Sequence, residues 1–270
     1  MSARLPDLLV IGAPKAATTT LTHWLRSHPQ AAVSEPKELE FFDRNFERGL
    51  GWYLERLPRD PGRRLVVEAT PTYLSEPGVA ERIADALPEA RFVALLREPA
   101  ARAWSNYWFF RWLGLEPRSW ARALASAQDR PGQGDDIGYV WRGRYAEQLA
   151  HWEALVGRDR LHVVLFDDVL ADPQAVYDGI CGFGGIAPAP VPGRESVNTT
   201  LVPRSARLQV LLSSPRAGRL RSRLRAWNAQ GRPVPKMTAE QVAELQTRFA
   251  APNADLADWL GRALPASWTA

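Results

Sequence analysis

Short apolar runs alternate with amphipathic segments along the first two thirds of this chain. Apolar runs without polar alternation predict buried strands, and apolar residues repeated every three or four positions predict helices. The predicted strands are 8–11, 65–67, 92–96 and 161–166, and the predicted helices are 19–27, 79–87, 100–113, 145–155 and 174–183. Short buried strands that alternate with helices are typical of a parallel sheet covered on both faces.

The pattern changes after Pro188, where closely spaced prolines predict a loop over 188–204. The helices expected after this loop are 205–212, 217–227, 239–250 and 254–264. We see no linker long or polar enough to separate a second domain. We therefore expect a single domain over residues 1–270, an α/β sandwich of three layers in which helices flank a central parallel sheet, with a helical C-terminal tail.

Composition and charge fit one α/β domain that binds an anion. The chain has 270 residues, of which 46% are apolar. Its net charge of +4 suits an anionic cofactor and does not require nucleic acid. The single cysteine, Cys181, excludes an intramolecular disulfide and gives no metal cluster. Because the apolar run over 8–13 is too short for a signal peptide or a membrane span, we expect a cytoplasmic protein without a membrane anchor.

Residues 8–25 have the pattern of a phosphate-binding loop. An apolar strand leads through Pro14 and Lys15 into three threonines and a helix. Backbone N–H groups at the start of such a helix bind anions, and the lysine and the hydroxyls add charge and donors. The lysine stands too early for a Walker A loop, and G-x-G-x-x-G is absent. An ordinary strand–helix turn with a surface lysine is the alternative.

A second candidate phosphate site follows the strand predicted over 92–96. Arg97 stands at the end of this strand, Pro99 suits the first turn of the next helix, and Ser105 lies two turns further on. A guanidinium and a hydroxyl together make a suitable phosphate clamp. Because the carboxyl ends of parallel strands meet at one edge, we expect Lys15, Thr70–Tyr73 and Arg97 at the same rim.

A third segment, residues 34–43, places acidic side chains beside aromatic rings. Glu38 and Glu40 stand next to two phenylalanines, and a carboxylate beside apolar rings can serve as a general base. We expect Glu35 and Lys37 to be solvated loop residues, and we interpret the four histidines of the chain as structural.

These segments resemble the sulfotransferases that use 3′-phosphoadenosine 5′-phosphosulfate (PAPS). Residues 14–19 resemble the 5′-phosphosulfate loop of that family, with Ala17 where glycine is usual. Alanine fits this position without strain if it is helical, and the match weakens if the position needs a positive φ. Residues 96–107 resemble the second signature, whose arginine and serine hold the 3′-phosphate, with Glu98 in place of Asp or Asn. Residues 38–43 resemble the E-x-x-F-F-D element of the heparan sulfate and related bacterial sulfotransferases.

The resemblance implies a P-loop-like fold and transfer of a sulfuryl group from PAPS to a hydroxyl, less often an amine, with PAP as the product and no metal. It implies Glu38 as the general base and Lys15 as the cation at the bridging oxygen. Residues 142–152 resemble the helix whose tyrosine contacts adenine, and Arg232 is a candidate for the loop that closes over the cofactor, with Arg204 as the alternative. The expected cofactor-binding residues are Lys15, Ala16, Ala17, Thr18, Thr19, Thr20, Arg97, Ser105, Tyr145 and Arg232.

The acceptor is expected to be a small molecule or secondary metabolite. Relatives in the heparan sulfate branch carry a lysine where this chain has Ala69, so the contacts to the acceptor differ there. The expected acceptor-binding residues are Glu40, Phe42, Thr70, Tyr73, Tyr107 and Trp108, although the aromatic cluster over 104–112 is expected to be mostly core.

Other functions and partners stay open at this point. The basic run over 216–225 is a solvated helix face by default and, alternatively, a docking surface for an acidic carrier protein that bears the acceptor. A nucleotide-dependent kinase of related fold and a non-catalytic nucleotide-binding module are the alternative functions.

Overall fold

The described chain divides into two compact units. The computed structural model describes residues 4–130, 137–193, 201–213, 223–224, 227–228 and 232–268. The first unit comprises Met1–Arg97, Tyr145–Glu195 and Trp259–Gly261, and the second comprises Glu98–Arg144, Ser196–Asp258 and Arg262–Ala270. The expectation of a single domain over the whole chain stays a prediction, and each unit is described by itself below.

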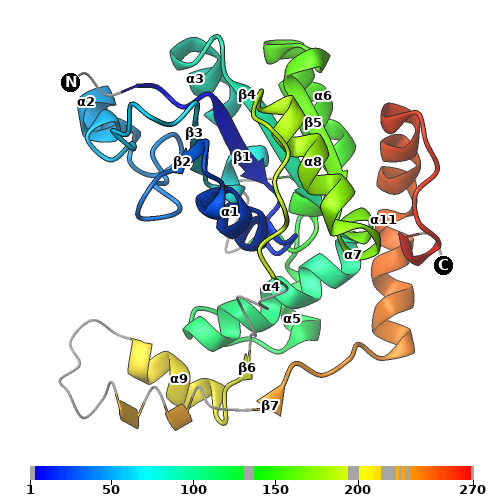
Figure 1. The fold of residues 1–270 in the computed structure, drawn as a ribbon. Coiled ribbons are helices and arrows are strands. Elements are labelled where there is room, and N and C mark those ends of the chain that lie inside the picture. The colour runs from blue at the N-terminus through cyan, green and yellow to red at the C-terminus, as the bar shows by residue number, and fades with distance from the viewer. Residues whose placement is uncertain are drawn as a thin grey trace. The chain divides into compact units, whose positions relative to one another are not determined.

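A parallel sheet of five strands forms the centre of the first unit. Figure 1 shows the strands in the order β2-β3-β1-β4-β5. Every residue of β1 and β3 is buried, because helices cover both faces of a parallel sheet. The strands are β1 (Leu8–Gly12), β2 (Ala31–Val33), β3 (Leu65–Ala69), β4 (Arg91–Leu96) and β5 (Leu161–Leu165). The four predicted strands are confirmed, and β2 is a further strand that the sequence pattern does not predict.

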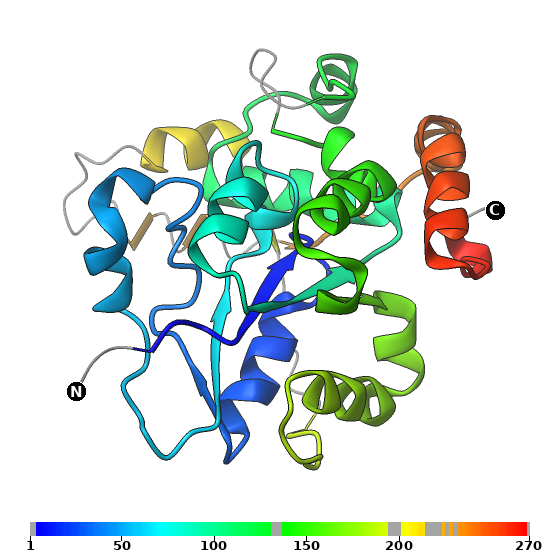
Figure 2. The same ribbon diagram turned by 90° about the horizontal axis from the view of Figure 1, so that it is seen from above.

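Helices cover the two faces of this sheet. Figure 2 shows α1 and α8 on one side of the sheet and α3 and α6 on the other. Tyr177 of α8 donates a hydrogen bond to the backbone oxygen of Trp24 in α1, and Trp152 of α6 packs on Phe92 of β4. The three-layer arrangement is therefore confirmed. The helices of this unit are α1 (Thr18–Ser27), α2 (Gly49–Leu54), α3 (Val79–Ala86), α6 (Tyr145–Val156), α7 (Phe166–Ala171) and α8 (Pro173–Phe183).

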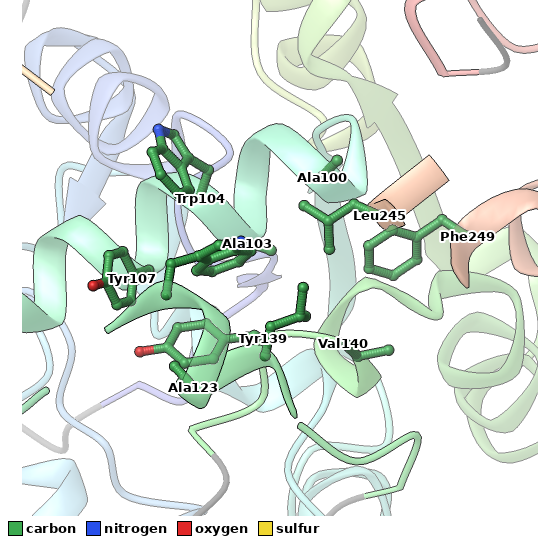
Figure 3. Packing of buried hydrophobic residues seen from close by; sticks show 11 residues of the cluster. Ala100, Ala103, Trp104, Tyr107, Ala123, Tyr139, Val140, Leu245 and Phe249 are labelled. Carbon is green, nitrogen blue, oxygen red and sulfur yellow. The ribbon is translucent and has the colours of Figure 1, made fainter. Parts of the chain in front are cut away.

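The second unit has its own hydrophobic cluster. Helix α4 (Pro99–Leu113) contributes Trp104 and Tyr107, and helix α11 (Ala239–Leu260) contributes Leu245 and Phe249 (Figure 3). Arg102 is buried on α4 and donates to the backbone oxygen of Tyr139 at 2.6 Å. The expectation that most aromatic residues of α4 belong to a core is confirmed for these two residues.

The C-terminal part of the chain differs from the sequence prediction. The two helices expected over 239–250 and 254–264 are one helix, α11, which continues through Pro252. The helix predicted over 217–227 falls largely outside the described residues. The remaining α-helices and strands of the described residues are α5 (Trp120–Ala125), α9 (Ala206–Ser213), β6 (Leu201–Val202) and β7 (Arg232–Pro233).

Candidate functional site

The loop after β1 leads directly into the N-terminus of α1. At Gly12 this loop approaches Leu74 so closely that a Cβ on the glycine would lie 2.5 Å from the leucine Cβ. Within the described chain, no side chain caps α1 and its first turn holds no acidic residue. The first N–H groups of a helix have no partner inside the helix, and the helix dipole adds positive potential there. The N-terminus of α1 therefore fits an anion.

Ala17 lies in the left-handed region of backbone space, with φ of 69° and ψ of 17°, immediately before α1. The position is therefore not helical, alanine does not fit it without strain, and the match to the phosphosulfate loop is weaker at Ala17. Glycine adopts this conformation without penalty, whereas a Cβ makes it unfavourable by about 1–2 kcal/mol. Lys15 also has a positive φ of 71°. The loop thus contains two strained non-glycine residues at the anion site, as is common for functional loops.

Lys15 is electrostatically coupled to the other charges of this edge. Burial is the main cause that lowers the pKa of Lys15 to about 8, and the charges of Arg97 and Lys37 lower it further, while Glu38 opposes the shift. The loop after β1, the loop after β2 and the end of β4 therefore bring these four side chains together.

Arg97 and Tyr145 are joined to the same loop. Arg97 Nη1 donates to the backbone oxygen of Lys15 at 3.2 Å, and its guanidinium lies over the ring of Phe166, 5.1 Å from the centroid. The Tyr145 hydroxyl donates to the backbone oxygen of Arg97 at 2.8 Å. These two contacts place Arg97 and Tyr145 next to the loop that carries Lys15.

The segment after β2 carries Glu38 to the N-terminus of α1. The Glu38 N–H donates to the backbone oxygen of Ala69 at 3.1 Å, and Glu38 has a positive φ of 61°. Lys37 Nζ donates to Glu38 Oε1 at 2.7 Å and to Thr19 Oγ1 at 2.9 Å. The expectation that Lys37 is solvated is therefore wrong, because its side chain is only 18% exposed. Sequence patterns carried no signal for this contact, since it depends on how the loop folds back on α1.

A buried acid lies beneath this segment. Glu68 is fully buried in β3, and burial raises its pKa to about 8. The Thr70 hydroxyl donates to Glu68 Oε1 at 2.6 Å and accepts from the Glu40 N–H at 3.3 Å. Burial also raises the pKa of Glu40. Thr70 thus connects the buried acid to the backbone that follows Glu38.

Two of the expected acceptor-binding residues are buried in an aromatic cluster. Phe42 and Tyr73 are fully buried, and their rings meet edge to face at 5.8 Å. The Tyr73 hydroxyl accepts hydrogen bonds from the Phe41 and Phe42 N–H groups at 2.9 and 3.3 Å. These contacts support the loop between Glu38 and α2. A direct contact of either residue with an acceptor stays a prediction.

Four of the expected site residues belong to the second unit. Ser105 lies half-buried on α4, and Tyr107 is buried with its hydroxyl donating to the backbone oxygen of Arg118. Trp108 is partly buried against the hydrophobic cluster, and Arg232 is exposed in β7. Their roles, including the pairing of Ser105 with Arg97, stay predictions. Glu98 caps α4 by accepting hydrogen bonds from the first backbone N–H groups of that helix.

The described residues show no sign of a metal site or of a membrane-spanning helix. They hold no cluster of three or more histidine, cysteine, aspartate or glutamate side chains able to bind a metal ion. Among the helices that the structure describes, none combines the length and apolar character needed to cross a membrane.

Similarity to known proteins agrees with this fold. Residues 49–190, which include Arg97 and Tyr145, match the Sulfotransferase family. A sulfotransferase from Alicyclobacillus acidocaldarius has a similar crystal structure, with a TM-score of 0.76 and 26% identity over 98% of this chain and 99% of that chain. The chain therefore belongs to the PAPS-dependent sulfotransferase family, and the predicted P-loop-like fold is confirmed.

Two further relatives extend the similarity. Human heparan sulfate glucosamine 3-O-sulfotransferase 6 is 32% identical over 190 residues, which cover 68% of this chain and 53% of that protein. The chain thus spans about half the length of this relative. A mouse sulfotransferase, solved in complex with PAP, shares the fold with a TM-score of 0.56 and 18% identity, over 97% of this chain and 89% of that one.

Proposed function

We propose that this protein transfers the sulfuryl group of PAPS to a hydroxyl group, less often an amine, of a small-molecule acceptor. The observation that carries the proposal is the meeting of Lys15, Arg97 and Glu38 at the carboxyl ends of the parallel strands. The uncapped N-terminus of α1 and the two cations fit the negative charge of a 5′-phosphosulfate. Membership of the sulfotransferase family favours this reaction over that of a kinase.

Each residue has a distinct task in this proposal. When bound, PAPS supplies a sulfuryl group that forms an S–O bond to the acceptor oxygen while the S–O bond to the 5′-phosphate breaks, and the phosphate oxygen keeps the electron pair. Lys15 neutralises the charge that grows on this oxygen, and Glu38 accepts the acceptor proton on its carboxylate. Thr18–Thr20 and the backbone N–H groups of α1 hold the 5′-phosphate. Arg97 with Ser105 holds the 3′-phosphate.

The exposure of the Glu38 side chain supports the proposed reaction with an acceptor. The Glu38 side chain is 45% exposed, so a hydroxyl from solution or from a group on a carrier protein can reach it. We propose that the protein acts in the cytoplasm and in secondary metabolism, because it resembles bacterial sulfotransferases. Residues 216, 219, 221 and 225 of the basic run that suggested a carrier lie outside the described residues.

Two experiments test the proposed function. Calorimetric titration should show that the protein binds PAP and that it binds ATP at least tenfold more weakly. A difference in affinity of about this size corresponds to the loss of one polar contact. Incubation with ³⁵S-labelled PAPS and pooled phenols, alcohols and amines should yield a labelled product. A protein that prefers ATP, or that binds PAP and labels no acceptor in any pool, contradicts the proposal.

A further inference from the structure

Lys37 lies between the N-terminus of α1 and the proposed base. Its ammonium donates to Thr19 Oγ1 in the first turn of the helix and to Glu38 Oε1 on the other side, at 2.9 and 2.7 Å. The lysine side chain is 18% exposed, against 45% for the glutamate. The ammonium is therefore held in a partly desolvated position, with the helix N-terminus next to it.

Positive charge gathers around this position. Lys15, Lys37 and Arg97 bring three positive charges to the loop, and Glu38 adds a carboxylate that acts on Lys15. The positive end of the α1 dipole adds to this excess, because the first turn of the helix holds no acidic residue. A bound phosphosulfate removes the excess, so the cation next to Thr19 gains a second and stronger partner.

Building on the proposed function, we propose that Lys37 is an exchangeable cation of the donor site. In the free protein its ammonium pairs with Glu38, and when donor binds at the N-terminus of α1 the same ammonium pairs with the 5′-phosphosulfate. The hydroxyl of Thr19 keeps it at the helix in both states. The lysine chain is flexible and its ammonium donates in three directions, so a small rotation completes the exchange.

The exchange has a consequence for Glu38. In the structure Oε1 of Glu38 accepts a hydrogen bond from Lys37. Once Lys37 turns to the phosphosulfate, this oxygen is available to the acceptor hydroxyl. Donor binding thus frees the proposed base, and Lys37 is a positioning residue for Glu38 as well as a ligand for the donor.

Calorimetric titration with PAP tests this exchange without an acceptor. Lys37→Met should weaken PAP binding about tenfold and make it less sensitive to salt, because one charge-assisted contact is lost. Lys37→Arg should bind within about threefold of the wild type, and Lys37→Gln, which keeps a donor for Thr19 without the charge, should resemble Lys37→Met. Arg44→Met is the matched control, since Arg44 is a cation of the same segment that pairs with Glu40 instead.

A double-mutant cycle gives the sharpest outcome. Glu38→Gln should tighten PAP binding several-fold, because Lys37 no longer has a carboxylate partner, and this gain should disappear in Lys37→Met/Glu38→Gln. The exchange is wrong if Lys37→Met binds PAP with wild-type affinity. It is also wrong if Glu38→Gln tightens PAP binding equally with and without Lys37. Either result leaves the proposed function intact. If the wild type fails to bind PAP, the proposed function itself is wrong.

Discussion

Arg97 donates a hydrogen bond of 3.2 Å to the backbone oxygen of Lys15. This contact ties the end of β4 to the loop after β1, and so fixes two cations close together at the edge of the sheet. The charged form of Lys15 is disfavoured there, because its burial and the charge of Arg97 lower its pKa to about 8. Such a pair is stabilised by a bound anion, which makes anion binding sensitive to the protonation of Lys15.

PAP binding should therefore weaken as the pH rises through about 8. The protonated form of Lys15 binds the anion, and the free protein loses this proton near pH 8, well below the ordinary lysine value of 10.5. Affinity should change little between pH 7 and 8 and fall by up to about tenfold per pH unit above 8. Calorimetry between pH 6.5 and 9.5 measures this, and proton uptake on binding should appear in the same range.

Two variants of Lys15 control this experiment. Lys15→Met should bind PAP roughly 10- to 100-fold more weakly at pH 7, as expected for a lost hydrogen bond to a charged group. Its affinity should no longer change between pH 7 and 9.5. Lys15→Arg keeps its charge over the whole range and should also give a flat profile, at higher affinity. A Lys15→Met protein that keeps the wild-type pH dependence would show that another group titrates.

Glu38→Gln should abolish turnover without weakening PAP binding. The amide keeps the shape of the side chain and its exposure, and it cannot accept the acceptor proton, so the rate should fall by about 10²- to 10⁴-fold. Label transfer from PAPS measures the rate, and calorimetry measures binding on the same sample. Glu35→Gln is the matched control, because Glu35 is an exposed glutamate of the same loop and should retain full activity. Full activity in Glu38→Gln would remove Glu38 from the mechanism.

The sequence predicts the strands and helices that have a distinctive local pattern of apolar residues. The unbroken apolar run of β1 and the cluster of residues at the strand ends could be read from the sequence. Strand β2 could not, because Ala31, Ala32 and Val33 form no distinctive run. Pro252 predicted a break where α11 continues, since a packed helix can tolerate one proline. The contact of Lys37 with Thr19 depends on the tertiary path of a loop, which no local pattern encodes.

Ala17→Gly should stabilise the protein. Ala17 holds a φ of 69°, where a Cβ is unfavourable, so glycine should raise the free energy of unfolding by about 0.5–1 kcal/mol after its greater chain entropy is counted. Urea unfolding and the melting temperature measure the change. Ala84→Gly is the control, because Ala84 lies inside helix α3 and the same replacement there should destabilise by about 1 kcal/mol. Equal losses in both variants would contradict the strain at Ala17.

Glu68→Gln should flatten the dependence of stability on pH. The folded protein raises the pKa of Glu68 from 4.5 to about 8, so the folded state keeps a proton that the unfolded chain loses between these values. The stabilising contribution of neutral Glu68 is complete below pH 4.5 and is lost as the pH rises towards 8, on the order of a few kcal/mol. Glutamine stays neutral throughout, and its carbonyl can still accept from Thr70 as Glu68 does. Urea unfolding between pH 5 and 8 should therefore show a falling free energy of unfolding for the wild type and a shallower slope for the variant.

Glu116→Gln is the control, because the hydrogen bonds of Arg118 lower the pKa of Glu116 and the wild-type slope over this range should persist. An unchanged slope in Glu68→Gln would show that Glu68 is ionised in the folded protein.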